Sequence, residues 1–171
     1  MSDKLIEEIY ANRYNTSTTS RKDIGDIYVD NIPINIKSSR VGGNNYSPNL
    51  VSADKLYNYL IDEKNILKFL FCTYESSTEK DIEILEETIV YAEHISWDCL
   101  DIRCQGKGVI QLSRNLKIDK NQTRQDFLNG FKNGYKIYIE KERKKLNKLE
   151  QKYVWIKGLS ECNKSRKDKS H

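Results

Sequence analysis

The segment GDIYVDNIPINIKSS constrains the fold more than any other part of the chain. Two runs rich in β-branched residues, Asp26–Val29 and Ile32–Ser38, flank the dipeptide Asp30-Asn31, which favours a tight hairpin turn. In the second run, isoleucines occupy every other position. Successive side chains of a strand point to opposite faces of the sheet. The pattern therefore predicts a hairpin with isoleucines on one face and Asn35 and Lys37 together on the other.

The remaining elements follow from hydrophobic spacing and end signals. Apolar residues recur at helical intervals in three segments, the last of which starts at a Thr123 cap with Asp126 three residues on: Asp3–Tyr14, Leu50–Ile61 and Thr123–Tyr153. Four apolar runs predict strands: Ile66–Tyr74, Glu83–Tyr91, Trp97–Cys104 and Val109–Leu112. This order indicates a mixed α/β (α+β) fold with a central mixed sheet flanked by helices and a long C-terminal helix.

Length and composition indicate one domain and a particular environment. A chain of 171 residues can bury one core, and we expect a single domain over residues 1–156 and a disordered basic tail over 157–171. Apolar runs are too short for a membrane span, and the first ten residues do not resemble a signal peptide. We expect a cytoplasmic protein of bacterial type, with no membrane partner and with its four cysteines reduced.

The charge is distributed unevenly. Lys141–His171 contains 11 Lys and Arg against 4 Asp and Glu, whereas the first 140 residues contain 18 against 21. Such an asymmetry suits a polyanionic partner. A solvated helix face followed by a frayed tail explains the basic segment equally well.

The predicted hairpin carries the residue types that phosphodiester hydrolysis requires. A hard divalent cation prefers oxygen ligands, which Asp26, the Asn35 amide and the main-chain carbonyl of Ile36 could provide. Lys37 lies on the same face as Asn35 and could stabilise an attacking hydroxide or developing negative charge. On spacing alone, a solvent-facing hairpin surface remains the alternative.

Three pieces of the chain, GDIYV, INIKSS and YSPNLVSADKL, resemble the core of PD-(D/E)xK nucleases. They are most similar to type II restriction endonucleases of the HincII/HpaI group. The resemblance implies a restriction-endonuclease-like core, catalytic roles for Asp26 and Lys37, and cleavage of double-stranded DNA with Mg²⁺, which Mn²⁺ could replace. It also implies a homodimer and a cognate DNA methyltransferase in the same restriction system.

Two positions of the expected site need separate comment. Position 35 is Asn where the family pattern usually has Asp or Glu, so the ligand offers an oxygen but no charge. In this fold the first helix often adds an acid, for which Glu7 or Glu8 is available, with Glu8 as the candidate accessory acid. A surface glutamate on an amphipathic helix is the alternative.

Residues for DNA recognition are expected in the loops that flank the site. Asn and Gln can bind adenine, and Lys can bind guanine or phosphate. The expected DNA-binding residues are Ser38, Ser39, Asn44, Asn45, Asn49, Gln105 and Lys107. The Gly- and Asn-rich stretch Arg40–Asn49 would also suit an ordinary exposed loop.

Three functions remain open from sequence. The first is a sequence-specific restriction endonuclease acting as a homodimer on a short palindrome. The second is a repair or junction-resolving nuclease that prefers DNA structure over sequence. The third is a DNA-binding module that has lost catalysis through the change at position 35.

Overall fold

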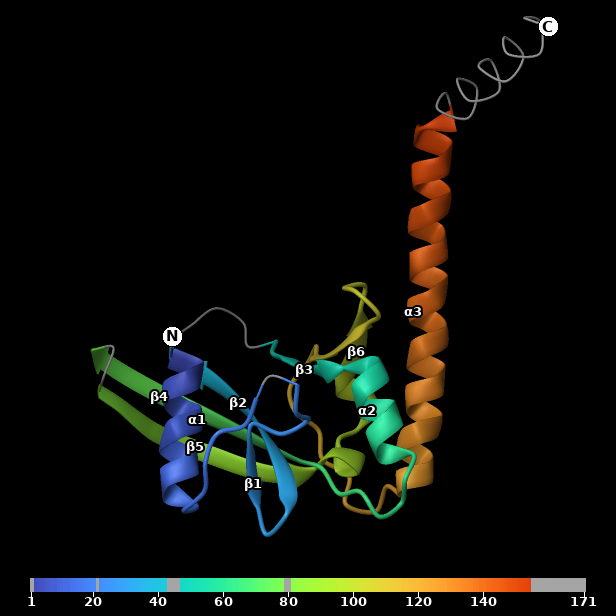
Figure 1. The fold of residues 1–171 in the computed structure, drawn as a ribbon. Helices are drawn as coiled ribbons and strands as arrows, with labels where there is room; N and C mark the ends of the chain where they lie inside the picture. The colour runs from blue at the N-terminus through green and yellow to red at the C-terminus, as the bar shows by residue number, and fades with distance from the viewer. Residues whose placement is uncertain (1, 21, 43–46, 79–80, 155–171) are drawn as a thin grey trace, which may run out of the picture.

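The computed structural model describes residues 2–20, 22–42, 47–78 and 81–154, which form two sheets and three α-helices (Figure 1). The elements in chain order are α1 (Ser2–Arg13), β1 (Ile27–Val29), β2 (Ile32–Arg40), β3 (Asn49–Ser52), α2 (Ala53–Leu60), β4 (Lys68–Thr78), β5 (Asp81–Tyr91), the 3-10 turns η1 (Ala92–His94) and η2 (Trp97–Cys99), β6 (Leu100–Arg103), β7 (Val109–Leu112) and α3 (Arg124–Lys152). The predicted mixed α/β architecture is confirmed.

The larger sheet is mixed, with strand order β1-β2-β4-β5. β1 and β2 form the predicted hairpin, in which Asp30 and Asn31 both have positive φ angles of 51° and 62°. Such angles are required in the turns whose twist matches that of the flanking strands. β2 then pairs in parallel with β4, and β5 returns antiparallel to β4. The parallel pair requires a crossover, and α2 lies within it.

Each face of this sheet has its own hydrophobic core. On one face α1 packs through Ile6 and Tyr10 onto Ile34 and Ile36 of β2. On the other face Phe69 and Phe71 of β4 contact a larger cluster that includes α2, α3 and the second sheet, whose order is β3-β7-β6. The isoleucines at 34 and 36 therefore share one face, as their alternation predicted.

The long helix α3 is anchored by a tryptophan. Trp97 packs between Phe127 and Phe131, and its indole N–H donates a 2.8 Å hydrogen bond to the Phe127 carbonyl. Gly130 permits this contact, because a Cβ there would lie 2.2 Å from the indole ring. The predicted cap is confirmed, since Thr123 and Asp126 form a capping box.

Two segments adopt another element than the one expected. Asn49, expected in a loop, and Leu50–Ser52, expected to begin a helix, form strand β3, which pairs antiparallel with β7, and Ser52 then caps α2. Trp97–Cys99, expected to begin a strand, is the 3-10 turn η2, in which the Cys99 thiol accepts from the Lys117 main-chain N–H. The basic tail over 157–171 lies outside the described residues.

No helix in the described part of the chain combines the length and apolar character of a membrane span. Of the cysteines in that part, Cys72 and Cys99 are buried, and these two and Cys104 are free thiols. Burial raises the pKa of the Cys72 and Cys99 thiols, which keeps both in the neutral form that a core accepts.

Candidate active site at the end of the hairpin

Asp26 is held at the point where β1 begins. Gly25 brings the chain close to β2, since a Cβ there would lie 2.7 Å from the Cβ of Pro33. The Asp26 main-chain N–H donates to the Ile34 carbonyl at 2.8 Å. Its carboxylate oxygen Oδ2 accepts from the Ile36 main-chain N–H at 2.6 Å. A side chain thus replaces the main-chain partner that Ile36 would have if β1 were longer.

The Ile36 carbonyl lies on the same edge of β2 as this carboxylate. The N–H and C=O of one strand residue point to the same side, and Ile36 points its N–H at Asp26. The β1–β2 register stops at the Ile27–Ile34 pair. The Ile36 carbonyl is therefore beyond the last paired residue of β1 and is available as an oxygen ligand.

Asn35 is buried, with 7% of its surface exposed. Its amide nitrogen donates a 2.9 Å hydrogen bond to the Ile24 carbonyl, which fixes the orientation of the amide. Its oxygen, Oδ1, is buried and has no hydrogen-bond partner among the described residues. A buried carbonyl oxygen without a partner is energetically unfavourable and is typical of a site that binds something.

Lys37 lies among acids. Burial lowers the pKa of the Lys37 ammonium, while the charges of Asp26, Asp3 and Glu7 act in the opposite direction. Burial also raises the pKa of the Asp26 carboxyl, against the hydrogen bond from Ile36 and the charges of Lys37 and Lys55. The structure thus brings together the two residues that the sequence predicted to be catalytic.

Of the two candidate acids on α1, Glu7 lies closer to the charged residues of the hairpin. The pKa of Glu7 is raised by burial first, and then by the nearby charges of Asp26 and Asp3. Glu8 is exposed. The accessory role expected of Glu8 stays a prediction, but the structure places Glu7, not Glu8, within electrostatic range of Asp26 and Lys37.

Two further charged residues of this site were not predicted from sequence. Asp3 lies one helical turn before Glu7, and its carboxylate accepts a 3.1 Å hydrogen bond from the Ser38 hydroxyl. Lys55 of α2 donates to the Asp23 carbonyl and contributes positive charge at Asp26. The i, i+4 spacing of Asp3 and Glu7 was a usable signal for the first. Lys55 had none, because only the tertiary fold brings α2 to the hairpin.

The expected DNA-binding residues lie in several places. Ser38 and Ser39 continue β2 beyond Lys37, and Asn49 is exposed at the start of β3. Gln105 and Lys107 are exposed in the β6–β7 turn, where the Lys107 ammonium lies 4.0 Å from the Asp54 carboxylate at the start of α2. Asn44 and Asn45 lie outside the described residues.

The residues present fit a divalent cation in part. Asp26, Asn35 and Ile36 offer a carboxylate, an amide and a main-chain oxygen, which are the donors that Mg²⁺ prefers. Among the described residues, no three His, Cys, Asp or Glu side chains form a metal-binding group. A cation at the hairpin would depend on one carboxylate, with the unpartnered Asn35 oxygen as the second side-chain ligand.

In comparisons with known proteins, no family model matches the chain, and no curated protein matches it significantly.

Proposed function

We propose that this protein is a Mg²⁺-dependent endonuclease of double-stranded DNA, with a type II restriction endonuclease as the closest functional class. One observation carries the proposal. Asp26 and Lys37 lie close enough at the end of the hairpin for each to shift the pKa of the other, and Asn35 presents a buried oxygen without a partner among the described residues. Partial burial of a lysine, a carboxylate and an unpaired amide oxygen destabilises a hairpin, and such groups are typical of functional sites.

The topology supports the same proposal. A helix precedes an antiparallel hairpin, and the second strand of the hairpin is joined through α2 to a parallel neighbour. This arrangement is compatible with the restriction-endonuclease-like core that the sequence resemblance implies. It also places acids from α1 and a cation from α2 around the same strand end.

Each residue has a definable part in hydrolysis. A water attacks the phosphorus and gives up a proton to solvent, the bond from phosphorus to the leaving sugar oxygen breaks, and that oxygen gains a proton from solvent. Lys37 would donate a hydrogen bond to the attacking oxygen or to the charge that develops on the phosphate. Asp26, Asn35 and the Ile36 carbonyl would hold Mg²⁺ (or Mn²⁺), which supplies activation of water and neutralisation of phosphate charge.

Recognition of a particular sequence is the finer part of the proposal. Asn49, Gln105 and Lys107 are exposed and carry groups able to bind base edges or phosphates. A short palindrome would be cut by a homodimer, because each subunit then serves one strand. A partner DNA methyltransferase that protects the same sequence would belong to such a system.

A cleavage assay on long, mixed-sequence duplex DNA tests the proposal. Discrete bands that require Mg²⁺ or Mn²⁺ and vanish with EDTA are expected of a restriction endonuclease. A smear would favour the repair or junction-resolving alternative. DNA that stays intact with both metals would refute both nuclease assignments.

One feature of the site favours a second candidate, a DNA-binding module without catalysis. Asn35 provides no charge where a second carboxylate would strengthen metal binding. This candidate predicts DNA binding that persists in EDTA and no cleavage with either metal. Electrophoretic mobility shifts measured with EDTA and with Mn²⁺ separate it from the nuclease.

A further inference from the structure

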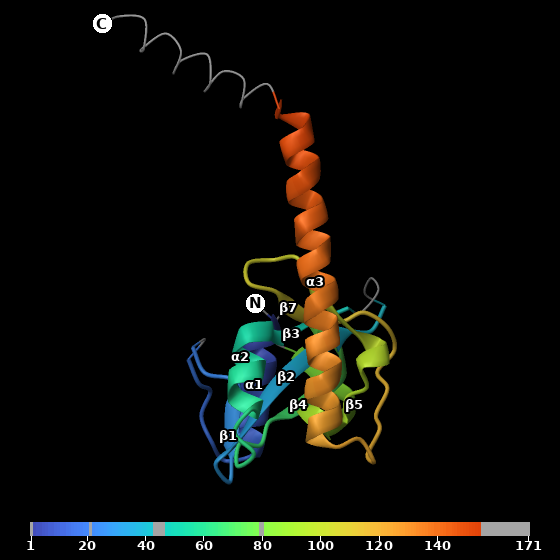
Figure 2. The ribbon, with the colours of Figure 1, turned by 90° about the vertical axis from the view of Figure 1, so that its right-hand side faces the viewer.

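The helix α3 extends well beyond the body that it packs on (Figures 1 and 2). Its buried residues, Phe127, Phe131 and Tyr138, all lie in its first half. Farther along, Lys141 pairs with Asp101 at the edge of the body. Glu142 and Lys145 still interact with the Cys104 thiol of the body. Beyond Lys145 the helix stands apart, and an isolated helical segment is marginal in water unless it packs on something.

The apolar stripe of α3 continues into the projecting half. Tyr135, Ile139, Leu146, Leu149 and Tyr153 are separated by three, four or seven positions, so they lie on one face of the helix. Leu146 is 59% exposed and Leu149 is 52% exposed. Two leucines one turn apart, both largely exposed on a helix that is otherwise rich in lysine, indicate a surface that a partner covers.

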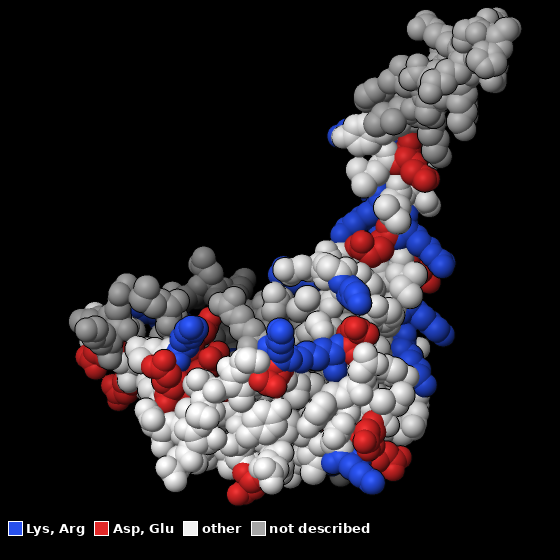
Figure 3. Space-filling view, viewed as in Figure 1, with Lys and Arg blue, Asp and Glu red and all other residues white. Residues whose placement is uncertain are grey.

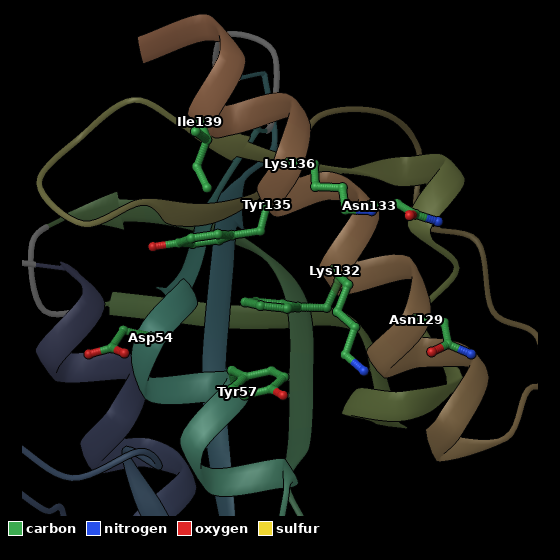
Figure 4. A pocket seen from close by; sticks show the side chains of 9 residues that line it. Asp54, Tyr57, Asn129, Lys132, Asn133, Tyr135, Lys136 and Ile139 are labelled. Carbon is green, nitrogen blue, oxygen red and sulfur yellow. The ribbon is translucent and has the colours of Figure 1, made fainter. Parts of the chain in front are cut away.

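The stripe leads into a groove on the body. A cavity of about 660 Å³ opens between α2 and α3, and its lining includes Tyr57, Tyr135 and Ile139 (Figure 4). Tyr57 stacks on Phe131 at 5.1 Å, which forms the aromatic floor of the groove. Since Tyr135 and Ile139 belong to both features, groove and stripe form one apolar surface, which we call the α3 face.

We propose that the projecting part of the α3 face, from Glu142 to Tyr153, binds the same part of a second copy of this chain, with the two helices antiparallel. An apolar stripe at heptad-like spacing matches another such stripe, and an identical chain supplies one. DNA fits the basic residues along α3 (Figure 3) but not a row of leucines and tyrosines. The inference rests on packing alone and would hold without nuclease activity.

Glu142 determines the orientation. It interrupts the stripe between Ile139 and Leu146, and its carboxylate interacts with the Cys104 thiol and, at 3.0 Å, with the Lys145 ammonium. Parallel helices would place Glu142 against Glu142 of the second copy, and like charges within a helix interface are destabilising. Antiparallel helices with Leu146 against Leu149 of the second copy place Glu142 beside a tyrosine, Tyr153, instead.

The first test is the molar mass of the full chain in EDTA and without DNA, measured by light scattering after gel filtration. The wild type is expected to be a dimer, and the Leu146→Glu/Leu149→Glu variant a monomer with unchanged helicity by circular dichroism. Ile137→Glu is the matched control, because Ile137 is 51% exposed on the opposite side of α3. It should remain a dimer.

A monomeric wild type overturns the proposal, and so does a Leu146→Glu/Leu149→Glu variant that remains dimeric. If the wild type is monomeric and the double variant loses affinity for duplex DNA, the α3 face binds DNA instead of a second copy. None of these outcomes depends on cleavage, so failure here is distinguishable from failure of the nuclease proposal.

Cysteine cross-linking tests the orientation. In a Cys104→Ser/Cys162→Ser background, chains carrying Leu146→Cys and chains carrying Leu149→Cys are oxidised separately and as a mixture. Antiparallel pairing predicts a disulfide-linked dimer in the mixture and little in either chain alone. Efficient linking of each chain by itself would indicate parallel helices and contradict the proposed orientation.

Discussion

The main-chain N–H of Ile36 donates a 2.6 Å hydrogen bond to the Asp26 carboxylate. This bond closes the sheet edge where β1 begins, and it also fixes the orientation of the carboxylate on the strand that carries Asn35 and Lys37. One carboxylate oxygen is engaged in it. Among the described residues no hydrogen bond occupies the other oxygen, which leaves it for a ligand.

The substitution Asp26→Asn should stabilise the protein and abolish cleavage. Burial raises the pKa of Asp26 in the fold, so the stability gained from protonation is complete below its ordinary pKa of 3.8 and is lost as pH rises through the raised value. At neutral pH the ionised Asp26 carboxylate therefore lowers the free energy of unfolding. Asn removes the charge and keeps an oxygen for the Ile36 N–H.

Thermal melting in EDTA checks this prediction. Asp26→Asn should melt a few degrees higher at neutral pH, where about 1 kcal/mol corresponds to about 2–4 °C in a chain of this size. The difference should shrink toward acidic pH. Asp30→Asn, in the exposed turn of the same hairpin, should change little. A lower melting temperature for Asp26→Asn would contradict the burial argument.

Glu7 and Glu8 offer a matched pair on neighbouring positions of α1. Glu7→Gln should reduce cleavage by about 10- to 100-fold, the range typical of residues that support a metal site, and Glu8→Gln should not. Because Glu7 raises the pKa of Lys37, its loss should also move the Lys37-dependent limb of the pH–rate profile to lower pH. Equal effects of both substitutions would remove Glu7 from the site.

Sequence patterns predicted the parts of this fold that depend on local interactions. The turn at Asp30-Asn31, the alternation along β2 and the Thr123–Asp126 capping box each need only a few neighbouring residues. The site was predicted to the same extent, since Asn35 and Lys37 share a strand and Asp26 is one hairpin turn away. These parts of the site follow from spacing, and the sequence resemblance supplied the chemical interpretation.

Parts that depend on distant segments could not be predicted. Asn49–Ser52 is a strand only because β7, some 60 residues later, pairs with it. Glu7 lies near Asp26 because α1 packs on the sheet through Ile6 and Tyr10, and Lys55 reaches Asp26 only through the position of α2. The helical spacing of apolar residues in 50–61 extends into β3, and the local sequence does not reveal that this part pairs with β7.

Asn35→Asp should make the protein's stability depend on divalent metal. In EDTA this variant should melt below the wild type, because a buried carboxylate would then face the Ile24 carbonyl without the donated hydrogen bond. Mg²⁺ or Mn²⁺ should recover several degrees and preserve or raise cleavage. Asn31→Asp, in the exposed turn of the same hairpin, is the control. If neither metal shifts the Asn35→Asp melting curve, Asn35 is not a ligand.

The most direct measurement of the central claim compares Lys37→Ala with Lys64→Ala in cleavage of mixed-sequence duplex DNA with Mg²⁺. Lys64 is exposed in the loop between α2 and β4, so its removal changes the net charge equally without touching the site. The account predicts that Lys37→Ala lowers the cleavage rate by at least about 100-fold, while Lys64→Ala cleaves like the wild type. Undiminished cleavage by Lys37→Ala would contradict it.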